Sequence, residues 1–208
     1  MTDDPGMLAR IRHSFDQAAI TYDAAAVLQK EIASRLQESL DIMRLEVGSL
    51  LDAGCGTGDS YEPLRQKFPG AHIVMMDLSE NMLAQASRQG GWWRRPDLVC
   101  GNLDALPFAG QSFDMVYSSL ALQWCNDHVT VFSEIWRCLR PGGLCIFSTF
   151  GPDTLRELRQ AWRAVDDAEH VNSFTDMHDL GDAMLQAGFA EPVMHAEHIE
   201  MQYRQVDT

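Results

Sequence analysis

Hydrophobic positions along the chain alternate between two periodic patterns. Five short apolar runs are typical of buried strands: residues 49–52, 72–77, 97–101, 113–118 and 144–150. Between them, apolar residues recur every three or four positions, as in amphipathic helices, over residues 60–67, 80–88 and 127–139. Pro141-Gly142-Gly143 predicts a turn before the fifth run. This alternation of strands and helices predicts a doubly wound, mostly parallel α/β sheet with right-handed crossovers.

Both ends of the chain add helices to this pattern. Residues 7–46 carry two apolar stripes with helical spacing, and Tyr22 and Asp23 stand between them. We expect residues 1–46 to form a helical lid segment on a domain of residues 47–208, the two making one structural domain.

The residues after the fifth strand predict two helices and a further strand. The first helix is expected over 153–165, beginning at the Pro-Asp pair 152–153, and the second over 176–187. Thr175 is the expected N-cap of the second helix, and Gly188 its end. A strand is expected over 193–203.

The most informative stretch joins the first strand to its helix. The apolar run ends at Asp52 and passes into Gly54, Gly56 and Gly58, with Cys55 among them. Glycines there permit a tight turn and a close approach of the backbone to a ligand. Ligands bind at such strand ends in parallel sheets. The spacing is not that of the dinucleotide fingerprint, and no lysine follows as in a phosphate-binding loop.

Two further strand ends carry polar groups. The second strand ends in Asp77, whose carboxylate can accept both hydroxyls of a ribose; a solvated strand-end aspartate is the alternative. The third strand leads into Asn102 and Leu103. The Asn102 side chain can accept from an exocyclic amine and the Leu103 N–H can donate to a ring nitrogen, so this pair would recognise adenine.

Together, these residues resemble the class I S-adenosylmethionine methyltransferases between residues 45 and 150. The resemblance implies a Rossmann-like fold that binds S-adenosylmethionine and releases S-adenosylhomocysteine. Many relatives have Asp at the position of Asn102, and Asn keeps the acceptor oxygen without the charge. The cofactor-binding residues that the resemblance implies are Asp52, Gly54, Cys55, Gly56, Gly58, Asp77, Leu78, Asn102, Leu103 and Ser118.

Segments outside this core resemble one family, the malonyl-[acyl-carrier protein] O-methyltransferases of biotin synthesis. The resemblance implies methyl transfer to the free carboxylate of a malonyl thioester, on acyl-carrier protein or on coenzyme A. That carboxylate is ionised near pH 7, so the reaction requires alignment and no general base. The similar segments are residues 14–23, 120–125, 150–158, 161–166 and 172–174.

Three residues are candidates for the acceptor side. Tyr22 is expected as a lid over the transferred methyl group, although an aromatic residue between two helices can also be simple packing. Gln123 and Trp124 follow the fourth strand and are expected to wall the acceptor pocket, with packing of a helix start as the alternative for Trp124. His128 is expected at a helix end and not as a base.

Charge and composition narrow the choice of partners. The 208 residues include 16 Lys+Arg and 30 Asp+Glu, a net charge of −14, which opposes binding to nucleic acid or an anionic membrane. An acidic carrier protein would need a local basic face, for which Arg156, Arg159 and Arg163 share one predicted helix; a solvated face is the alternative. The five cysteines lack a C-x-x-C pair, and no metal-ligand spacing or signal peptide appears. We expect a cytoplasmic protein without a metal.

Other assignments remain open at this point. Trans-aconitate methyltransferase shares the core and a Gln-Trp pair, and an arginine hydroxylase that assembles respiratory complex I is similar over residues 150–158 and 173–180. A binding module without catalysis is the alternative from another class. Members of the malonyl family continue beyond residue 208 with a helix and an antiparallel strand. The sheet is therefore expected to lack its final strand, as in a C-terminally truncated chain.

Overall fold

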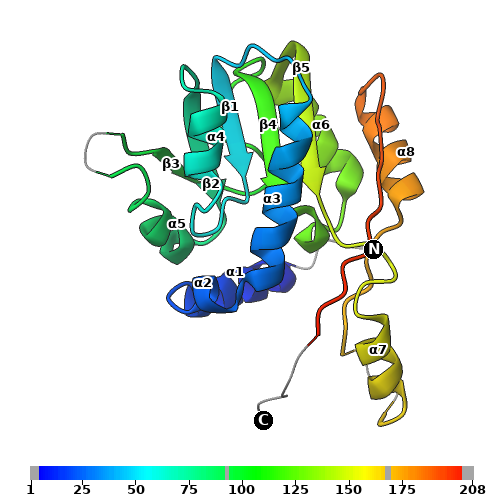
Figure 1. The fold of residues 1–208 in the computed structure, drawn as a ribbon. Coiled ribbons are helices and arrows are strands. Elements are labelled where there is room, and N and C mark those ends of the chain that lie inside the picture. The colour runs from blue at the N-terminus through cyan, green and yellow to red at the C-terminus, as the bar shows by residue number, and fades with distance from the viewer. Residues whose placement is uncertain (1–4, 92–93, 167–169, 203–208) are drawn as a thin grey trace.

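A five-stranded parallel sheet forms the centre of the computed structural model (Figure 1), which describes residues 5–91, 94–166 and 170–202. The strands follow the spatial order β3-β2-β1-β4-β5, and every neighbouring pair is parallel. This order confirms the doubly wound α/β fold, since the chain reverses direction across the sheet between β1 and β4. The strands are β1 (Ser49–Ala53), β2 (His72–Asp77), β3 (Asp97–Cys100), β4 (Phe113–Ser119) and β5 (Leu139–Ser148).

Helices cover both faces of the sheet, and alternate strand residues face opposite helix layers. Leu50 and Met75 pack with α3, α4 and α5 on one face. Leu51 and Met76 pack with α6 and α8 on the other. The helices are α1 (Pro5–Ala18), α2 (Tyr22–Ala25), α3 (Val27–Asp41), α4 (Tyr61–Lys67), α5 (Glu80–Ala86), α6 (His128–Cys138), α7 (Arg156–Arg163) and α8 (Met177–Ala187), with a 3-10 turn, η1, at Leu122–Trp124.

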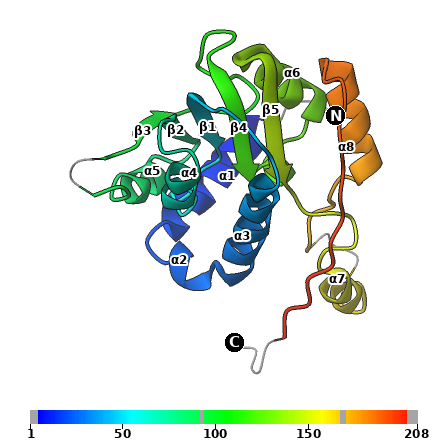
Figure 2. The ribbon, with the colours of Figure 1, turned by 45° about the horizontal axis from the view of Figure 1, so that its top comes forward.

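The first two helices cross the end of the sheet at which the strands finish. In Figures 1 and 2, α1 and α2 lie across the arrowheads of the strands, and α3 then runs back alongside the sheet. Tyr22 and Asp23, expected between two helices, begin the single turn α2. The N-terminal segment therefore covers the edge at which parallel sheets bind ligands.

The turn predicted at Pro141–Gly143 lies inside a strand. Leu139 pairs with Phe113 and Leu144 with Met115, so residues 140–143 stand opposite Asp114 alone. Gly142 has a φ of 78°, which accommodates this bulge. The chain therefore enters β5 directly from α6, and the tripeptide bends the strand without ending it.

Three predictions about the C-terminal region are corrected. Residues 193–202 form no strand; Val193 is 90% exposed, and Glu197 pairs with Arg35 of α3 at 2.9 Å, so polar contacts with a helix replace sheet pairing there. Residue 203 lies outside the described residues. Asp176, and not Thr175, caps α8 by accepting from the His178 N–H. Helix α7 begins later than predicted because Leu155 before it has a φ of 56°. Gly188 ends α8 as expected, with a φ of 109°.

Candidate functional site

A cavity of about 100 Å³ lies at the carboxyl ends of the strands, under the N-terminal segment. Its floor comes from the glycine turn after β1 and from the residues that follow β2, β3 and β4. Its cover comes from α1 and the start of α2. The lining residues are Leu8, Ile11, Phe15, Tyr22, Gly54, Gly56, Met76, Asp77, Leu78, Met82, Gly101, Asn102, Leu103, Asp104, Ser119, Leu120, Ala121, Trp124 and Cys125.

The glycine turn leaves one backbone face open to this cavity. Gly54, Gly56 and Gly58 all have φ between 55° and 87°, which side chains other than glycine rarely adopt. A Cβ at Gly54 would lie 2.3 Å from the Ala121 Cβ, whereas a Cβ at Gly56 would meet nothing within 4 Å. Gly54 is therefore required for packing, and Gly56 leaves room for a ligand against the backbone.

Asp77 links the glycine turn to the start of α5. Its Oδ2 accepts from the Gly56 N–H and its Oδ1 from the Ser79 N–H, both at 2.8 Å. Each carboxylate oxygen keeps a second lone pair, so the side chain can still accept from two hydroxyl groups. Burial raises the pKa of Asp77, and the backbone N–H groups oppose that shift. The arrangement fits the diol of a ribose.

In the turn after β3, two polar residues hydrogen-bond to each other. Asn102 Nδ2 donates to Asp104 Oδ2 at 3.2 Å, and Asn102 Oδ1 accepts from the Asp104 N–H at 3.3 Å. Asp104 Oδ1 is buried and has no hydrogen-bond partner within the described part of the chain. Asp104 also lines the cavity, and sequence reasoning missed it.

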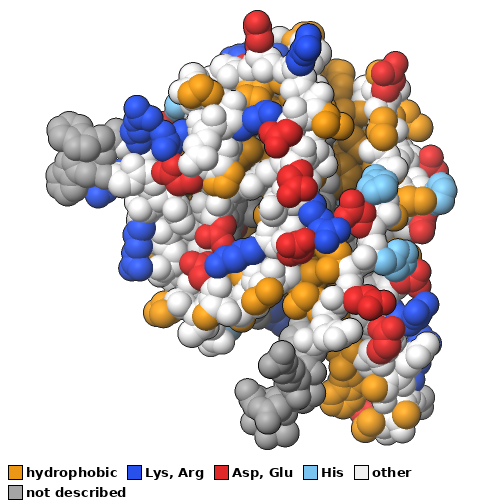
Figure 3. All heavy atoms as spheres, viewed as in Figure 1, with side chains coloured by type: hydrophobic (Ala, Val, Ile, Leu, Met, Phe, Trp, Pro, Cys, Tyr) orange, Lys and Arg blue, Asp and Glu red, His pale blue; other side chains and the backbone are white. Residues whose placement is uncertain are grey.

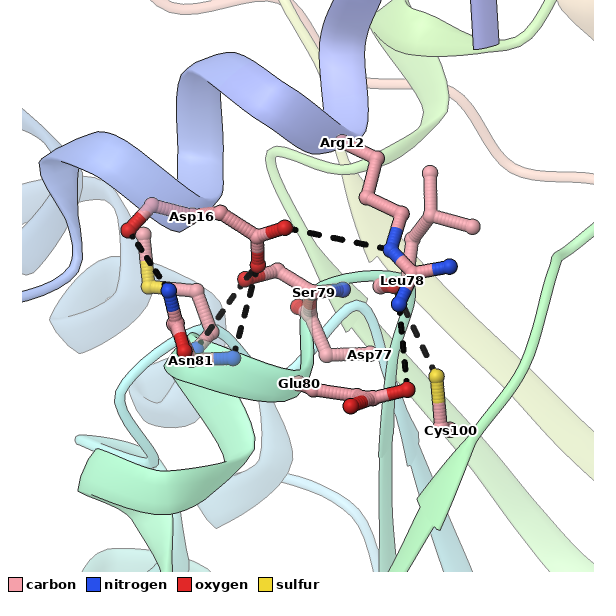
Figure 4. Close-up of polar contacts among 9 residues, drawn as sticks. Arg12, Asp16, Asp77, Leu78, Ser79, Glu80, Asn81 and Cys100 are labelled. Carbon is pink, nitrogen blue, oxygen red and sulfur yellow. Dashed lines mark hydrogen bonds and ion pairs between the residues drawn. The ribbon is translucent and has the colours of Figure 1, made fainter. Parts of the chain in front are cut away.

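Helix α1 is anchored to the turn that follows Asp77 (Figure 4). Ser79 Oγ–H donates to Asp16 Oδ1 at 2.5 Å, and Asn81 Nδ2 donates to the Asp16 carbonyl at 3.0 Å. Arg12 and Glu80 form an exposed ion pair beside them at 3.0 Å. We call the Asp16–Ser79–Asn81 group the Asp16 anchor. It connects α1 to the same turn that holds the Asp77 carboxylate.

A second anchor joins α2 to the glycine turn. Thr57 Oγ–H donates to Asp23 Oδ1 at 2.6 Å, and Lys30 pairs with Asp59 at 3.5 Å. Thr57 is buried, which shields this hydrogen bond from water. The N-terminal segment is therefore held on two sides of the cavity.

Aromatic side chains gather beneath the N-terminal segment. Phe15 packs edge-to-face against Trp124, with ring centroids 5.3 Å apart, and against Tyr22 at 6.5 Å. Burial, followed by the nearby charge of Asp77, raises the pKa of Tyr22, so its hydroxyl stays protonated at neutral pH. Tyr22 and Trp124, both expected on the acceptor side, thus reach the same cavity as Asp77.

Gln123 turns away from this cavity. Its Nε2 donates to the Leu120 carbonyl at 2.6 Å, and its Oε1 accepts from Thr149 Oγ at 3.4 Å. Leu120 has a φ of 53° and itself lines the cavity. Gln123 therefore supports the wall from behind and is not part of its surface.

Four other predicted residues lie behind the lining. Asp52 is 1% exposed and accepts from the Ser60 hydroxyl. Ser118 donates to the Ala53 carbonyl at 2.7 Å. Cys55 and Gly58 belong to the glycine turn without lining the cavity. By contrast, Gly54, Gly56, Asp77, Leu78, Asn102 and Leu103 are brought together around it.

The described residues include no metal-ion cluster and no membrane-spanning helix. His128, expected at a helix end, begins α6, and burial lowers its pKa. No cluster of three or more His, Cys, Asp or Glu side chains in residues 5–91, 94–166 and 170–202 is placed to hold a metal ion. None of the helices described there is both long and apolar enough to cross a membrane.

Known proteins are similar to this chain in sequence and in fold. Residues 51–147 match the family described as "Methyltransferase domain". Malonyl-[acyl-carrier protein] O-methyltransferase from Gallionella capsiferriformans is 46% identical over 202 residues, covering 94% of this chain and 70% of the relative. The protein of the same name from Laribacter hongkongensis is 50% identical over 207 residues, covering 95% of this chain and 69% of the relative. An S-adenosylmethionine-dependent methyltransferase from Mesorhizobium loti has a TM-score of 0.59 at 30% identity, covering 74% of this chain and 80% of that one. This chain therefore belongs to the malonyl-[acyl-carrier protein] O-methyltransferase family, within the class I S-adenosylmethionine-dependent methyltransferases.

Proposed function

We propose that this protein transfers the methyl group of S-adenosylmethionine to the free carboxylate of a malonyl thioester, as a step of biotin synthesis. The observation that carries the proposal is identity of 46% and 50%, over more than nine-tenths of this chain, to relatives named for that reaction. The cavity supports it, because a diol acceptor, an open glycine backbone and an aromatic cover meet there.

The cofactor would lie along the carboxyl edge of the sheet. Asp77 would accept the two ribose hydroxyls, and Gly56 would let the amino-acid part approach the backbone. The Leu103 N–H faces no acceptor within the described residues and is free to donate to an adenine ring nitrogen. S-adenosylmethionine, when bound there, supplies an electrophilic methyl group on a sulfonium.

The protein's contribution to catalysis would be alignment and exclusion of water. A malonyl carboxylate is ionised near pH 7 and needs no base. Phe15, Tyr22 and Trp124 would keep the acceptor pocket dry, which strengthens electrostatic attraction between the carboxylate and the sulfonium. The protonated Tyr22 hydroxyl can donate a hydrogen bond and thereby orient the acceptor.

The N-terminal segment would serve as the lid of this site. Four of its side chains line the cavity, and the Asp16 anchor and the Thr57–Asp23 hydrogen bond hold it on two sides. Cofactor exchange would require at least one anchor to open. We take residues 1–46 as this lid segment and residues 47–208 as the cofactor-binding part of one structural domain.

Carrier protein would dock beside α7, which extends beyond the carboxyl edge of the sheet (Figure 1). Arg156 and Arg163 are exposed there, next to apolar side chains on α7 visible at the lower right of Figure 3. Arg159 donates hydrogen bonds to the backbone carbonyls of Pro152, Thr154 and Asn172, at 3.0 to 3.3 Å. The docking face would therefore depend on Arg156 and Arg163, with Arg159 joining α7 to the segments around Pro152 and Asn172.

Mass spectrometry of the acceptor tests the proposed reaction. Purified protein, S-adenosylmethionine and malonyl-acyl-carrier protein should give a carrier heavier by one methyl group, with S-adenosylhomocysteine as co-product. Mild alkali, which also hydrolyses the malonyl thioester, should remove the added methyl group from the carrier, whereas an N-methyl group on the protein would survive. Gain of an oxygen, methylation of trans-aconitate in preference to the malonyl thioester, or cofactor binding without transfer would each contradict the proposal.

A further inference from the structure

Three aromatic rings, contributed by the cover and by the floor of the cavity, lie next to one another. Phe15 belongs to α1, Tyr22 begins α2, and Trp124 ends η1. All three side chains are half-buried and line the cavity. The ring centroid of Phe15 lies 5.3 Å from that of Trp124 and 6.5 Å from that of Tyr22. The lid and the residues after β4 therefore share one aromatic surface.

The orientation of the rings leaves aromatic faces available to a ligand. The plane of Phe15 makes an angle of 88° with that of Trp124 and of 61° with that of Tyr22. In an edge-to-face contact, the positive edge of one ring meets the negative face of the other, so the contact covers at most one face. A free aromatic face attracts a cation that lies within about 6 Å of its centre. This surface is therefore suited to a positively charged group.

Two interactions of the N-terminal segment place Tyr22 between the residues proposed for the ribose and for the amino-acid part of the cofactor. Asp23, the next residue along the chain, accepts from the hydroxyl of Thr57 in the glycine turn at 2.6 Å. The charge of Asp77 contributes to raising the pKa of Tyr22, after the larger effect of burial. In S-adenosylmethionine, the sulfonium joins the ribose to the amino-acid part. The sulfonium would therefore lie beside Tyr22 and the two rings next to it.

We infer that Phe15, Tyr22 and Trp124 form an aromatic cage that recognises the positive charge of the sulfonium, so that the lid holds the charged cofactor more tightly than the neutral product. The inference rests on the proposed cofactor site but not on the acceptor substrate. When the methyl group is transferred, its bond to sulfur breaks and a bond to the carboxylate oxygen forms, while the electron pair of the broken bond stays on sulfur. A neutral thioether and a neutral ester remain. The cage then loses its attraction for the ligand, and the lid is loosened by the transfer itself.

Binding of the cofactor and of its product tests the cage without turnover. Isothermal titration gives the ratio of the Kd for S-adenosylhomocysteine to the Kd for S-adenosylmethionine, in which effects common to both ligands cancel. Trp124→Leu should lower this ratio about fivefold or more, because an attraction specific to the cation is lost. Tyr22→Leu should lower it in the same direction. Trp124→Phe and Tyr22→Phe keep an aromatic face and should retain most of the wild-type ratio.

Fluorination of the Trp124 ring separates its charge distribution from its shape. Fluorine atoms withdraw electrons from the aromatic face and change the size of the indole little. With an increasing number of fluorine atoms at this position alone, the Kd for S-adenosylmethionine should rise stepwise, whereas the Kd for S-adenosylhomocysteine should stay constant. A ring that only packs against Phe15 would give no such difference. The fluorinated series also decides the question if Trp124→Leu does not fold.

Phe108→Leu is the matched control, because it disrupts an aromatic pair of the same geometry elsewhere. The rings of Phe108 and Phe113 are 5.0 Å apart at 88°, close to the arrangement of Phe15 and Trp124. Neither phenylalanine of the control pair is among the described residues that line the cavity. The variant should therefore keep the wild-type Kd ratio, even where its thermal stability is lower.

Three outcomes would overturn the cage. One is an unchanged Kd ratio in folded Trp124→Leu and Tyr22→Leu proteins. Another is an equal response of both ligands to fluorination of Trp124. The third is a fall of the ratio in Phe108→Leu as large as that in Trp124→Leu. A wild-type protein that binds neither ligand would reject the proposed cofactor site together with the cage, whereas failure of malonyl methylation with the predicted ratios intact would reject only the proposed acceptor.

Discussion

The buried carboxyl group of Asp52, behind the cavity lining, makes the stability of the protein depend on pH. Burial raises its pKa from 3.8 to about 7, and the hydrogen bond from Ser60 only partly opposes this shift. The folded protein thus holds the Asp52 proton more tightly than the unfolded chain does. The free energy of unfolding therefore falls as pH rises from about 4 to about 7.

Replacing Asp52 by asparagine should remove this pH dependence. The new amide would keep an oxygen for the Ser60 hydroxyl but carries no titratable proton. Relative to wild type, Asp52→Asn should gain on the order of 2–3 kcal/mol of unfolding free energy between pH 5 and pH 8. Urea unfolding at the two pH values measures the difference. Parallel pH profiles for both proteins would show that Asp52 is not the group responsible.

Gln123 supplies a second prediction at this scale. Its amide donates to the carbonyl of Leu120, whose left-handed backbone is unfavourable for a side chain with a Cβ. Gln123→Glu keeps the shape but loses the donor, so it should lower the free energy of unfolding by about 1–3 kcal/mol. Thr149→Val, which removes only the other contact of Gln123, should cost less. A smaller loss in Gln123→Glu than in Thr149→Val would refute the supporting role of this hydrogen bond.

Position along the chain predicted some of these residues and not others. Asp77 and Asn102 follow apolar strands, and parallel strands end at one edge, so their proximity follows from the pattern alone. The direction in which Gln123 points depends on a carbonyl in a strained turn, which no periodicity reveals. Asp104 was missed for a related reason, because its importance lies in an unpaired oxygen and not in its spacing.

At the scale of elements, helix α1 combines an apolar face with a polar anchor. Leu8, Ile11 and Phe15, which lie on one face of the predicted helix, reach the cavity. Asp16, next to Phe15, joins α1 to Ser79 and so to the turn that holds Asp77. Amphipathic spacing predicted the face, but the anchor depends on two elements 63 positions apart in the sequence.

Breaking the Asp16 anchor should weaken cofactor binding without touching the cofactor. Asp16→Ala removes the acceptor for Ser79 and frees α1, so the Kd for S-adenosylmethionine should rise about tenfold, mainly through faster dissociation. Asp16→Asn keeps an acceptor oxygen and should recover most of the affinity. Titration calorimetry and stopped-flow release measure the two effects.

Glu80→Gln is the control for the Asp16 anchor. It removes the exposed Arg12–Glu80 ion pair on the same turn and should change the Kd by no more than about twofold, since exposed pairs contribute little. If Asp16→Ala bound the cofactor as tightly as Glu80→Gln, the anchor would have no role in holding the lid.

Two predicted elements, the turn at residues 141–143 and the strand after residue 193, differ in the structure because of how strands pair. The bulge at residues 140–143 keeps β5 continuous because pairing with β4 resumes at Leu144. The apolar positions of 193–202 suggested a strand, but a strand also requires a neighbour whose backbone groups are free and aligned. Pairing of Glu197 with α3 shows that this segment follows another course here.

At the scale of the whole molecule, the net charge of −14 sets a problem for an acidic partner. General attraction is excluded, so docking must depend on a local group of positive side chains. On α7, Arg156 and Arg163 remain exposed while Arg159 holds three carbonyls. Helical spacing grouped all three arginines. The contacts distinguish Arg159, which donates to backbone carbonyls, from the exposed Arg163 and from Arg156, which is also exposed and lies 3.8 Å from Glu157.

Charge reversal on α7 should affect the carrier and spare a small substrate. The double variant Arg156→Glu, Arg163→Glu should raise the KM for malonyl-acyl-carrier protein about tenfold at low salt, with kcat and the KM for malonyl-coenzyme A nearly unchanged. Arg44→Glu is the matched control, because it reverses an exposed charge that follows the C-terminal end of α3 and lies outside α7. Equal KM changes for both thioesters, or an equal effect of Arg44→Glu, would exclude α7 as the docking face.

In the proposed cycle, the two anchors of the N-terminal segment would also limit the rate of product release. S-adenosylhomocysteine held under α1 and α2 would leave only after the hydrogen bond of Ser79 to Asp16 or that of Thr57 to Asp23 opens. Each round of catalysis would then include one opening, whose frequency is governed by side chains remote from the reacting carbon. Substitutions between residues 12 and 23 could therefore make the enzyme faster or slower while its chemistry stays the same.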